Sequence, residues 1–162
     1  MNYFAERKKY FAGPNVVVKI SKSETIELKP PVPLEECAGI SYVLNNSQQP
    51  IYGYASSNFD AMLPGREIIQ GTILLNHTSP KPFYDAFNSI TDPPDLKQGN
   101  ISYNGFLNEP LDITIQFGNN HHSIIIEYCY IFSRGETVQI SEQGIVEEYS
   151  FIGRNLSYRE GK

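Results

Sequence analysis

The stretch Gln49–Asn76, which reads QPIYGYASSNFDAMLPGREIIQGTILLN, decides how the rest of this 162-residue chain is interpreted. Its second half, Arg66–Asn76, alternates as a strand does, because successive side chains of a strand point to opposite faces. The two faces hold Ile69, Gly71, Ile73 and Leu75 on one side and Ile68, Gln70, Thr72 and Leu74 on the other. Pro64-Gly65 is turn chemistry, and a glycine inside a strand, such as Gly71, marks a bulge, a bend or a close backbone approach. We therefore predict two strands, Gln49–Tyr54 and Arg66–Asn76, flanking a loop or arm over Ala55–Gly65.

The composition predicts one mainly β domain. The chain has 11 Tyr, 9 Phe and no Trp, and its 11 Pro and 12 Gly indicate many turns. A formal net charge of −5 argues against binding to duplex nucleic acid, because such proteins present a basic patch and this chain offers only Arg7-Lys8-Lys9. Mild acidity is compatible with a channel through which nucleic acid slides without sticking.

The cysteines and the apolar runs predict a soluble protein made in a cytoplasm. Cys37 and Cys129 lie in or beside apolar runs, as small buried hydrophobes do, and they imply no disulfide framework. The first residues, MNYFAERKKYFAG, lack the apolar run of a secretory signal. No apolar run approaches the roughly 20 residues that a membrane helix needs, so we expect no membrane contact.

The rest of the chain is rich in predicted strands. We expect strands over Asn15–Ile20, Glu24–Lys29, Cys37–Leu44, Leu111–Phe117, Ser123–Ser133, Thr137–Ile140 and Ile145–Gly153. We expect turns at Asn45–Ser47, Gly118–His122 and Arg134–Glu136, an extended connector at Pro30–Pro33, a long loop over 91–110 and a loose tail over Arg154–Lys162. Phe83, Phe87 and Ile90 follow helical spacing, which predicts a short helix over Phe83–Ile90 packed on the sheet.

This order of elements, with the glycine-aromatic turn of IYGY and the closing segment EEYSFIGRNL (Glu147–Leu156), resembles the tail-tube family of contractile bacteriophages. The resemblance covers roughly residues 35 to 157. It implies an antiparallel β-sandwich or barrel with one or two short helices and a protruding β-hairpin arm that overlaps a neighbouring subunit. It also implies a non-enzymatic virion protein that forms or extends a ring of the tail tube, baseplate or neck, with six copies per ring, through which DNA passes. The proline-rich connectors and the 91–110 loop favour a specialised ring over the repeated tube subunit.

We divide the chain into an N-terminal arm (1–14), a tail-tube-like β domain (15–157, with the long loop 91–110) and a flexible tail (158–162). The first segment holds Tyr3, Phe4, Tyr10 and Phe11, and it is either a frayed terminus or an arm whose aromatic side chains dock on a neighbouring subunit. The expected partners are copies of the chain itself and neighbouring tail-tube, baseplate or neck proteins. DNA is a partner only in passage.

Two sets of residues are candidate assembly surfaces. The resemblance implies subunit contacts at Ile51, Tyr52, Tyr54, Phe59, Met62, Leu63, Gly65 and Gly71. The polar face of the long strands is expected to line the lumen through Gln70, Thr72, Thr114 and Gln116. The aromatic residues Tyr52, Tyr54 and Phe59 have two interpretations, as core residues of a sandwich or as anchors between subunits.

No arrangement in the sequence predicts catalysis, a metal or a cofactor. His121-His122 would point to opposite faces of a strand, and no zinc-like spacing accompanies them. Cys129, the thiol that could pair with His77 or His121, sits in the apolar run IIIEYCYIF. The runner-up function is a monomeric β-sandwich module that binds a ligand or carbohydrate on its tyrosines. The lack of Trp and of a secretion signal weighs against it.

Overall fold

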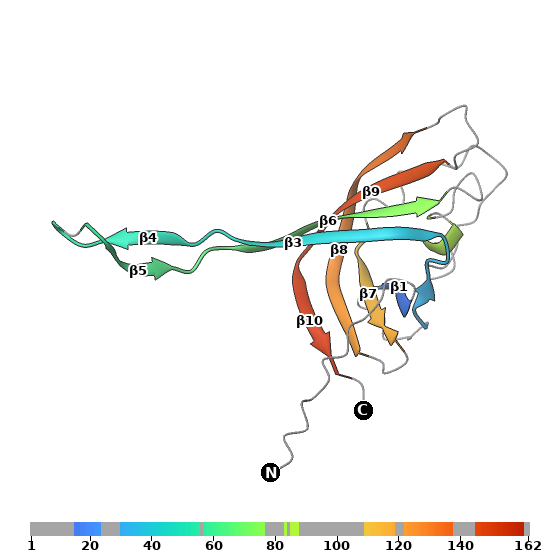
Figure 1. Cartoon of the computed structure of the whole chain (residues 1–162), viewed down its shortest axis with the longest axis horizontal. Helices are drawn as coiled ribbons and strands as arrows, with labels where there is room; N and C mark the ends of the chain where they lie inside the picture. Colours follow the sequence, from blue (N-terminus) through green and yellow to red (C-terminus); the bar gives the residue numbers. More distant parts are fainter. Residues whose placement is uncertain are drawn as a thin grey trace, which may run out of the picture.

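The computed structural model describes residues 15–23, 30–55, 57–76, 83, 85–87, 109–118, 122–137 and 145–160. The strands are β1 (Val16–Lys22), β2 (Val32–Pro33), β3 (Cys37–Asn46), β4 (Gln49–Tyr52), β5 (Phe59–Leu63), β6 (Glu67–Asn76), β7 (Leu111–Phe117), β8 (His122–Thr137), β9 (Val146–Gly153) and β10 (Asn155–Arg159). Residues 83 and 85–87 are helical. The expected mainly antiparallel β fold with a short helix is confirmed (Figure 1).

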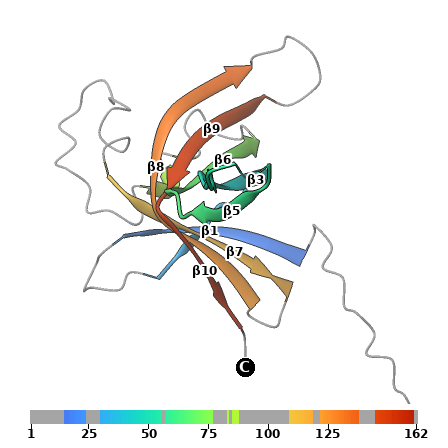
Figure 2. The same ribbon diagram turned by 90° about the vertical axis from the view of Figure 1, so that its left-hand side faces the viewer.

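The strands form two packed sheets that share β8. Sheet A has the order β2-β1-β7-β8-β10 and uses the lower half of β8, residues 122–129. Sheet B has the order β8-β9-β6-β3 and uses the upper half of β8, residues 130–137. Figure 2 looks along the molecule and shows β9, β6 and β3 above β1, β7 and β10, with β8 running through both groups. The two sheets therefore form a β-sandwich joined along one side by a single strand.

The core lies between the sheets because β1, β6, β7 and β9 bury side chains on alternate positions. On β6 the buried positions are Ile69, Ile73 and Leu75, and on β7 they are Leu111, Ile113 and Ile115. Further core residues come from β1, β8, β9 and the helix: Val18, Ile20, Ile126, Cys129, Ile131, Tyr149, Phe151, Phe83 and Phe87. Phe83 stacks on Tyr149 with 4.6 Å between ring centroids, so the helical segment covers the core at this point.

The strand β8 bends from one sheet into the other at Tyr128. Tyr128 has φ of 52°, a left-handed conformation that L-residues rarely adopt. Its backbone N–H donates to Asp112 Oδ1 over 3.0 Å, and the hydroxyl of Ser23 donates to the same oxygen. The strands paired with β8 are interrupted at the same position along it. β9 ends at Gly153 and β10 begins at Asn155, and the N–H of Arg154 between them donates to the Glu127 carbonyl. β8 and the segment formed by β9 and β10 thus pass from one sheet to the other at the same place.

The hairpin of β3 and β6 extends beyond the sandwich as an arm. The ladder between them runs from Cys37↔Leu75 to Asn46↔Glu67, and β4 and β5 continue it from Gln49↔Leu63 to Tyr52↔Phe59. Figure 1 shows this arm, the segment Gln49–Leu63, projecting from the body. The expected protruding hairpin is therefore present, and a regular strand, β5, occupies part of the predicted irregular segment Ala55–Gly65.

Four local predictions are wrong. Asn45 and Asn46 belong to β3 instead of a turn, and His122 begins β8 instead of ending one. The expected turn Arg134–Glu136 is part of β8, because Arg134 reaches the buried carboxylate of Glu147 at 2.8 Å and keeps the strand paired with β9. The tail Arg154–Lys162, expected to be loose, contains β10, which pairs with β8.

Other predictions agree with the strands or lie outside the described residues. The connector Pro30–Pro33 supplies only the two-residue β2 at a sheet edge, where proline is tolerated. The predicted segments 1–14, 24–29, 138–140 and most of 91–110 fall outside the described residues, as does the remainder of the predicted helix.

Gly71 permits the close packing of β6, and its replacement should destabilise the fold. A Cβ atom here would lie 2.4 Å from Phe151 Cζ and 2.5 Å from the Ser41 carbonyl oxygen. We expect Gly71→Ala to lower the free energy of unfolding by about 1–3 kcal/mol, the usual cost of overpacking. Gly39→Ala in β3 is the matched control, because nothing lies within 4 Å of its Cβ position. Urea unfolding compares the two variants, and equal effects would contradict this explanation.

Asp112 holds the bend of β8, and removing its carboxylate should also destabilise the protein. Asp112→Ala leaves the Tyr128 N–H without the acceptor 3.0 Å away. The loss should be about 1–3 kcal/mol, the cost of an unsatisfied polar group. Asp112→Asn retains an oxygen acceptor and should lose less. Thermal or urea unfolding of both variants is the measurement, and a larger loss in the asparagine variant would refute the assignment.

Candidate assembly surfaces

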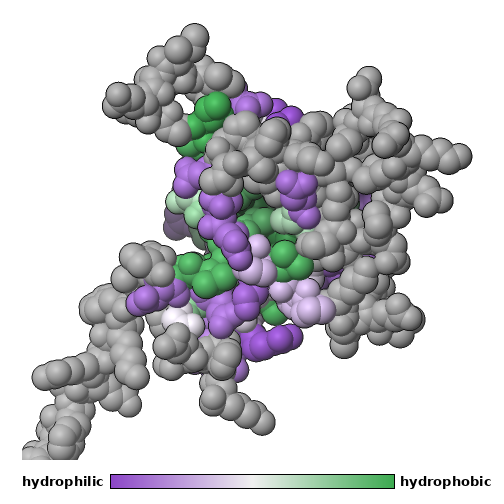
Figure 3. All heavy atoms as spheres, turned by 90° about the vertical axis from the view of Figure 1, so that its right-hand side faces the viewer, coloured by the Kyte–Doolittle hydropathy of each residue, from purple (hydrophilic) through white to green (hydrophobic). Residues whose placement is uncertain are grey.

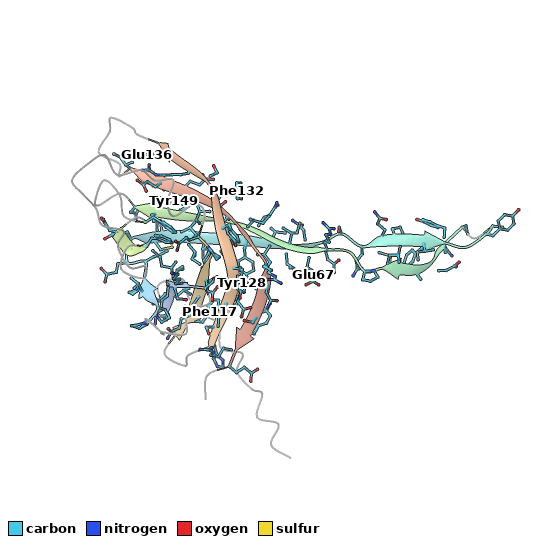
Figure 4. All side chains as sticks on the ribbon, turned by 180° about the vertical axis from the view of Figure 1, so that it is seen from behind. Glu67, Phe117, Tyr128, Phe132, Glu136 and Tyr149 are labelled. Carbon is cyan, nitrogen blue, oxygen red and sulfur yellow. The ribbon has the colours of Figure 1, made fainter. Side chains whose placement is uncertain are left out.

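The arm carries most of the predicted subunit-contact residues, and they are exposed. The exposed fractions are Ile51 40%, Tyr52 60%, Tyr54 105%, Phe59 56%, Met62 43% and Leu63 50%. These residues belong to β4, β5 and the tip between them, and Figure 4 shows the arm with its side chains extending beyond Glu67, away from the sandwich. A two-stranded hairpin has no second layer to cover such residues. Within the described part of the chain, the arm is therefore an apolar surface that no second layer of the same chain covers.

The structure contradicts one of the two interpretations of the aromatic residues, the one that places them in the core. Tyr52, Tyr54 and Phe59 are all more than half exposed, so none is a core residue in a single chain. Among the described residues, the aromatic side chains with 0% exposure are Phe83, Tyr149 and Phe151, and Phe87 is also in the core. Their role as anchors between subunits, for Tyr52, Tyr54 and Phe59, stays a prediction.

The two glycines of the predicted contact set have roles inside the chain. A Cβ on Gly65 would lie 1.8 Å from the Ser47 carbonyl oxygen, at the neck where the arm leaves the sandwich. Ser47 and Arg66 fix this neck by hydrogen bonds of 3.2 Å between backbones and 3.1 Å from the Arg66 N–H to Ser47 Oγ. Gly71 lies under Ser41 and Phe151 as described above. Both glycines allow close approach within the hairpin.

The four residues predicted to face a lumen do not share one surface. Gln70 and Thr72 alternate with buried Ile69 and Ile73, so they lie on the outer face of sheet B. Thr114 and Gln116 alternate with the buried residues of β7, so they lie on the outer face of sheet A. Because the sheets pack through their inner faces, these outer faces belong to different sides of the sandwich.

The outer face of sheet B is shallowly hollowed beside Gly71. The hollow measures about 420 Å³ and is lined by Ser41, Val43, Gln70, Thr72, Phe132 and Ser150 among others. Val43 is 60% and Phe132 61% exposed, and Figure 4 labels Phe132 on the upper half of β8. The sequence analysis did not single out these two residues. Phe132 follows the buried Ile131, but the bulge between Ile131 and Ser133 interrupts the alternation on β8. Val43 lies between the partly buried Tyr42 and the exposed Leu44, so no alternation marks it.

The cysteines do not form a reactive site. Cys129 is fully buried, and burial together with nearby Asp112 raises the pKa of its thiol far above the ordinary range. Burial also raises the pKa of the Cys37 thiol. A nucleophilic cysteine needs the opposite shift. His77 and His121, the histidines considered as partners of Cys129, lie outside the described residues.

The buried polar cluster beside the helix serves packing. Glu147 is fully buried, accepts from Tyr149 Oη at 2.5 Å and pairs with Arg134 at 2.8 Å. Burial and the hydrogen bond to Glu147 raise the pKa of Tyr149, so its hydroxyl stays protonated as a donor. Across the described ranges, no group of three or more His, Cys, Asp and Glu side chains is placed to hold a metal ion. The helical residues described here also include no segment long and apolar enough to span a membrane.

Comparison with solved structures identifies the architecture. The chain matches a subunit of the sheath–tube complex of the extracellular contractile injection system PVC in its extended state, with a TM-score of 0.61 and 15% identity over 95% of this chain and 94% of that one. The chain has the tail-tube fold. The SPP1 tail tube matches with a TM-score of 0.60 and 12% identity, over 94% of this chain and 80% of that one. The anti-feeding prophage baseplate matches with a TM-score of 0.55 and 10% identity, over 90% and 93%.

The likeness rests on the fold alone. No protein family and no curated protein sequence matches the chain. The tail-tube fold expected from the order of elements is thus confirmed, and the match extends over 94% of the PVC subunit and 93% of the anti-feeding prophage subunit.

Exposed arm aromatics and buried core aromatics should respond differently to substitution. We expect Phe59→Ser to change the free energy of unfolding by less than about 0.5 kcal/mol, as exposed positions do. The matched core variant Phe151→Ala should lose about 3–5 kcal/mol because it opens a cavity under Gly71. Chemical denaturation of dilute protein gives both values. A large loss in Phe59→Ser would mean that the arm packs on its own sandwich.

Proposed function

We propose that this protein is a structural component of a virion tail or a related injection apparatus, in which copies of it form or extend a ring around a central channel. The observation that carries the proposal is the tail-tube fold over almost the full length of the chain, shared with tube and baseplate subunits. Six copies per ring is the favoured number, because the matching baseplate structure is 6-fold symmetrised. No enzymatic role is part of the proposal.

The two ends of sheet B are the proposed ring contacts. Sheet B begins with the upper half of β8 and ends with β3. If β3 of each copy pairs with the upper half of β8 of the next, sheet B becomes a continuous barrel and its terminal strands are covered. Such a head-to-tail contact closes into a ring when the rotation between copies fits a whole number of subunits.

The outer face of sheet B is the proposed channel lining. It carries Gln70, Thr72, Ser41 and Ser150, and the strands β3, β6 and β9 contain no Lys or Arg. A wall without cations makes no counterion-releasing contact with phosphates, so DNA could slide past it. The outer face of sheet A is less suitable, because Lys19 lies opposite Thr114 there. Thr114 and Gln116 are accordingly assigned to the outside of the ring.

The arm is the proposed contact with a neighbouring copy or with an adjoining ring. Its exposed apolar residues are the kind that become hot spots when a partner excludes water from them. Tube, baseplate and neck rings remain alternatives for the position of the ring in the tail. A tyrosine platform for a ligand is less suitable, because Tyr54 lies at the tip of the hairpin between β4 and β5 and is fully exposed.

Replacing residues 48–65 by an Asn-Gly turn should remove assembly and leave the fold. The last ladder pair before the arm is Asn46↔Glu67, so a two-residue turn can close the shortened hairpin. We expect wild-type protein to give rings with a central hole by negative-stain electron microscopy, and a ring mass by mass photometry at rising concentration. The shortened variant should stay monomeric with unchanged circular dichroism.

Gln70→Ala serves as the matched control, because it changes the proposed lining and not a ring contact. It should form rings as the wild type does. Wild-type protein that stays monomeric at high concentration and also fails to bind tail proteins from a virion lysate would contradict the proposed function. Rings formed by the shortened variant would contradict the role of the arm.

A further inference from the structure

An apolar groove opens on the side of the sandwich that β8 does not close. It measures about 570 Å³ and lies between the start of β1, the connection after β2 and the start of β3. Its lining includes Val16, Val18, Leu34, Cys37 and Ile40. Figure 3 views the molecule from the side at which β3 begins and shows hydrophobic residues among hydrophilic ones on this face.

The groove exists because β1 and β3 lie near the unjoined ends of the two sheets. Sheet A and sheet B share β8 on one side, whereas on the other side residues 34–36 lead from β2 of sheet A to β3 of sheet B. The connection is held by the Leu34 N–H, which donates to the Val18 carbonyl over 2.8 Å. Val16, Cys37 and Ile40 are only partly buried although they pack against the core. The edge of the core is therefore accessible here.

We infer that residues 1–14 of the same chain fill this groove. The segment joins the fold immediately before Val16, which is itself part of the groove wall. Gly13-Pro14, directly before β1, is a dipeptide typical of turns, so the chain can reverse there and pass back along the groove. Tyr10 and Phe11 stand three and two positions before Gly13 and supply large apolar side chains.

Charge on the two partners is complementary. The segment carries Arg7-Lys8-Lys9, and Glu35 lines the groove with Glu36 next to it. Exposed ion pairs between such groups contribute little free energy. In this proposal they orient residues 1–14, and the aromatic side chains contribute most of the binding free energy. The short tether favours the groove of the same chain over that of a second copy, because it gives a high effective concentration. The inference concerns a single chain and does not depend on ring formation.

The thiol of Cys37 reports directly on the groove. Cys37 lines it and is half-buried, whereas Cys129 is fully buried and provides an internal reference. The experiment compares the rate of iodoacetamide alkylation of Cys37 in the full chain and in a variant lacking residues 1–14. We expect the alkylation rate of Cys37 to rise by about tenfold or more when residues 1–14 are removed. This is the change for a segment whose docked form outnumbers its undocked form by at least about ten to one.

Point variants separate docking from a general loss of structure. Tyr10→Ser with Phe11→Ser should raise the Cys37 rate as the deletion does, while Phe59→Ser on the arm should not. Lys8→Glu with Lys9→Glu should raise the rate several-fold, and adding Glu35→Lys with Glu36→Lys should lower it again. Cys129 must stay unreactive in each variant, which shows that the core is intact.

Two results would overturn the inference. Equal Cys37 rates with and without residues 1–14 would mean that the segment does not cover the groove. Protection that disappears on dilution of the full chain would mean that a second copy supplies the cover. Protection that is independent of protein concentration and lost with the aromatic pair supports docking within one chain.

Discussion

The bend of β8 at Tyr128 is the constraint on which the rest of the structure depends. A strand of 16 residues serves both sheets only because it changes direction at a residue with φ of 52°. Asp112 from β7 holds the backbone of this residue, and Arg154 allows β9 and β10 to follow the same turn. A left-handed tyrosine costs free energy, and such conformations persist where surrounding contacts over-determine them. The guanidinium of Arg154 lies 5.4 Å from the centre of the Tyr128 ring, which is one such contact.

Joining the sheets on one side only has consequences at the opposite side. It leaves the groove between β1 and β3, and it leaves β3 at the end of sheet B. The same β3 continues into the arm, so one hairpin supplies a piece of core, a terminal strand and an exposed apolar extension. The core covers only the part of this hairpin in which β6 pairs with β9, from Ile69 to Asn76. Beyond Asn46 and Glu67 its side chains have no second layer from the described part of the chain.

The sequence predicted the elements whose burial alternates and failed where other parts of the molecule decide. β6, β7 and β9 bury every second residue, so their faces and most of their lengths could be predicted. β10 has the polar sequence NLSYR and exists because it pairs with β8, with Glu127 accepting hydrogen bonds from Asn155 and Ser157. The stretch SRGE of β8 resembles a turn until the buried Glu147 on another strand is known.

The candidate surfaces show the same limit. The arm residues could be identified because apolar side chains crowd a short segment between turn-forming residues. The lumen set could not be divided correctly, because Gln70, Thr72, Thr114 and Gln116 all look alike as polar positions of alternating strands. Only the pairing of strands shows that β6 belongs to sheet B and β7 to sheet A. This pairing depends on contacts between segments that lie far apart in the sequence.

The character of β3 gives an independent argument that sheet B is completed by another chain. Proteins protect terminal strands with charged side chains, proline or bulges, because an open strand edge recruits other chains. The ten residues of β3, CAGISYVLNN, contain no charge and no proline, and the bulge lies only at the start, between Cys37 and Gly39. At the other end Val43 and Leu44 are 60% and 45% exposed. A strand of this composition is a poor edge for a protein that works alone and a suitable one for a protein whose edge is covered by its neighbour in a ring.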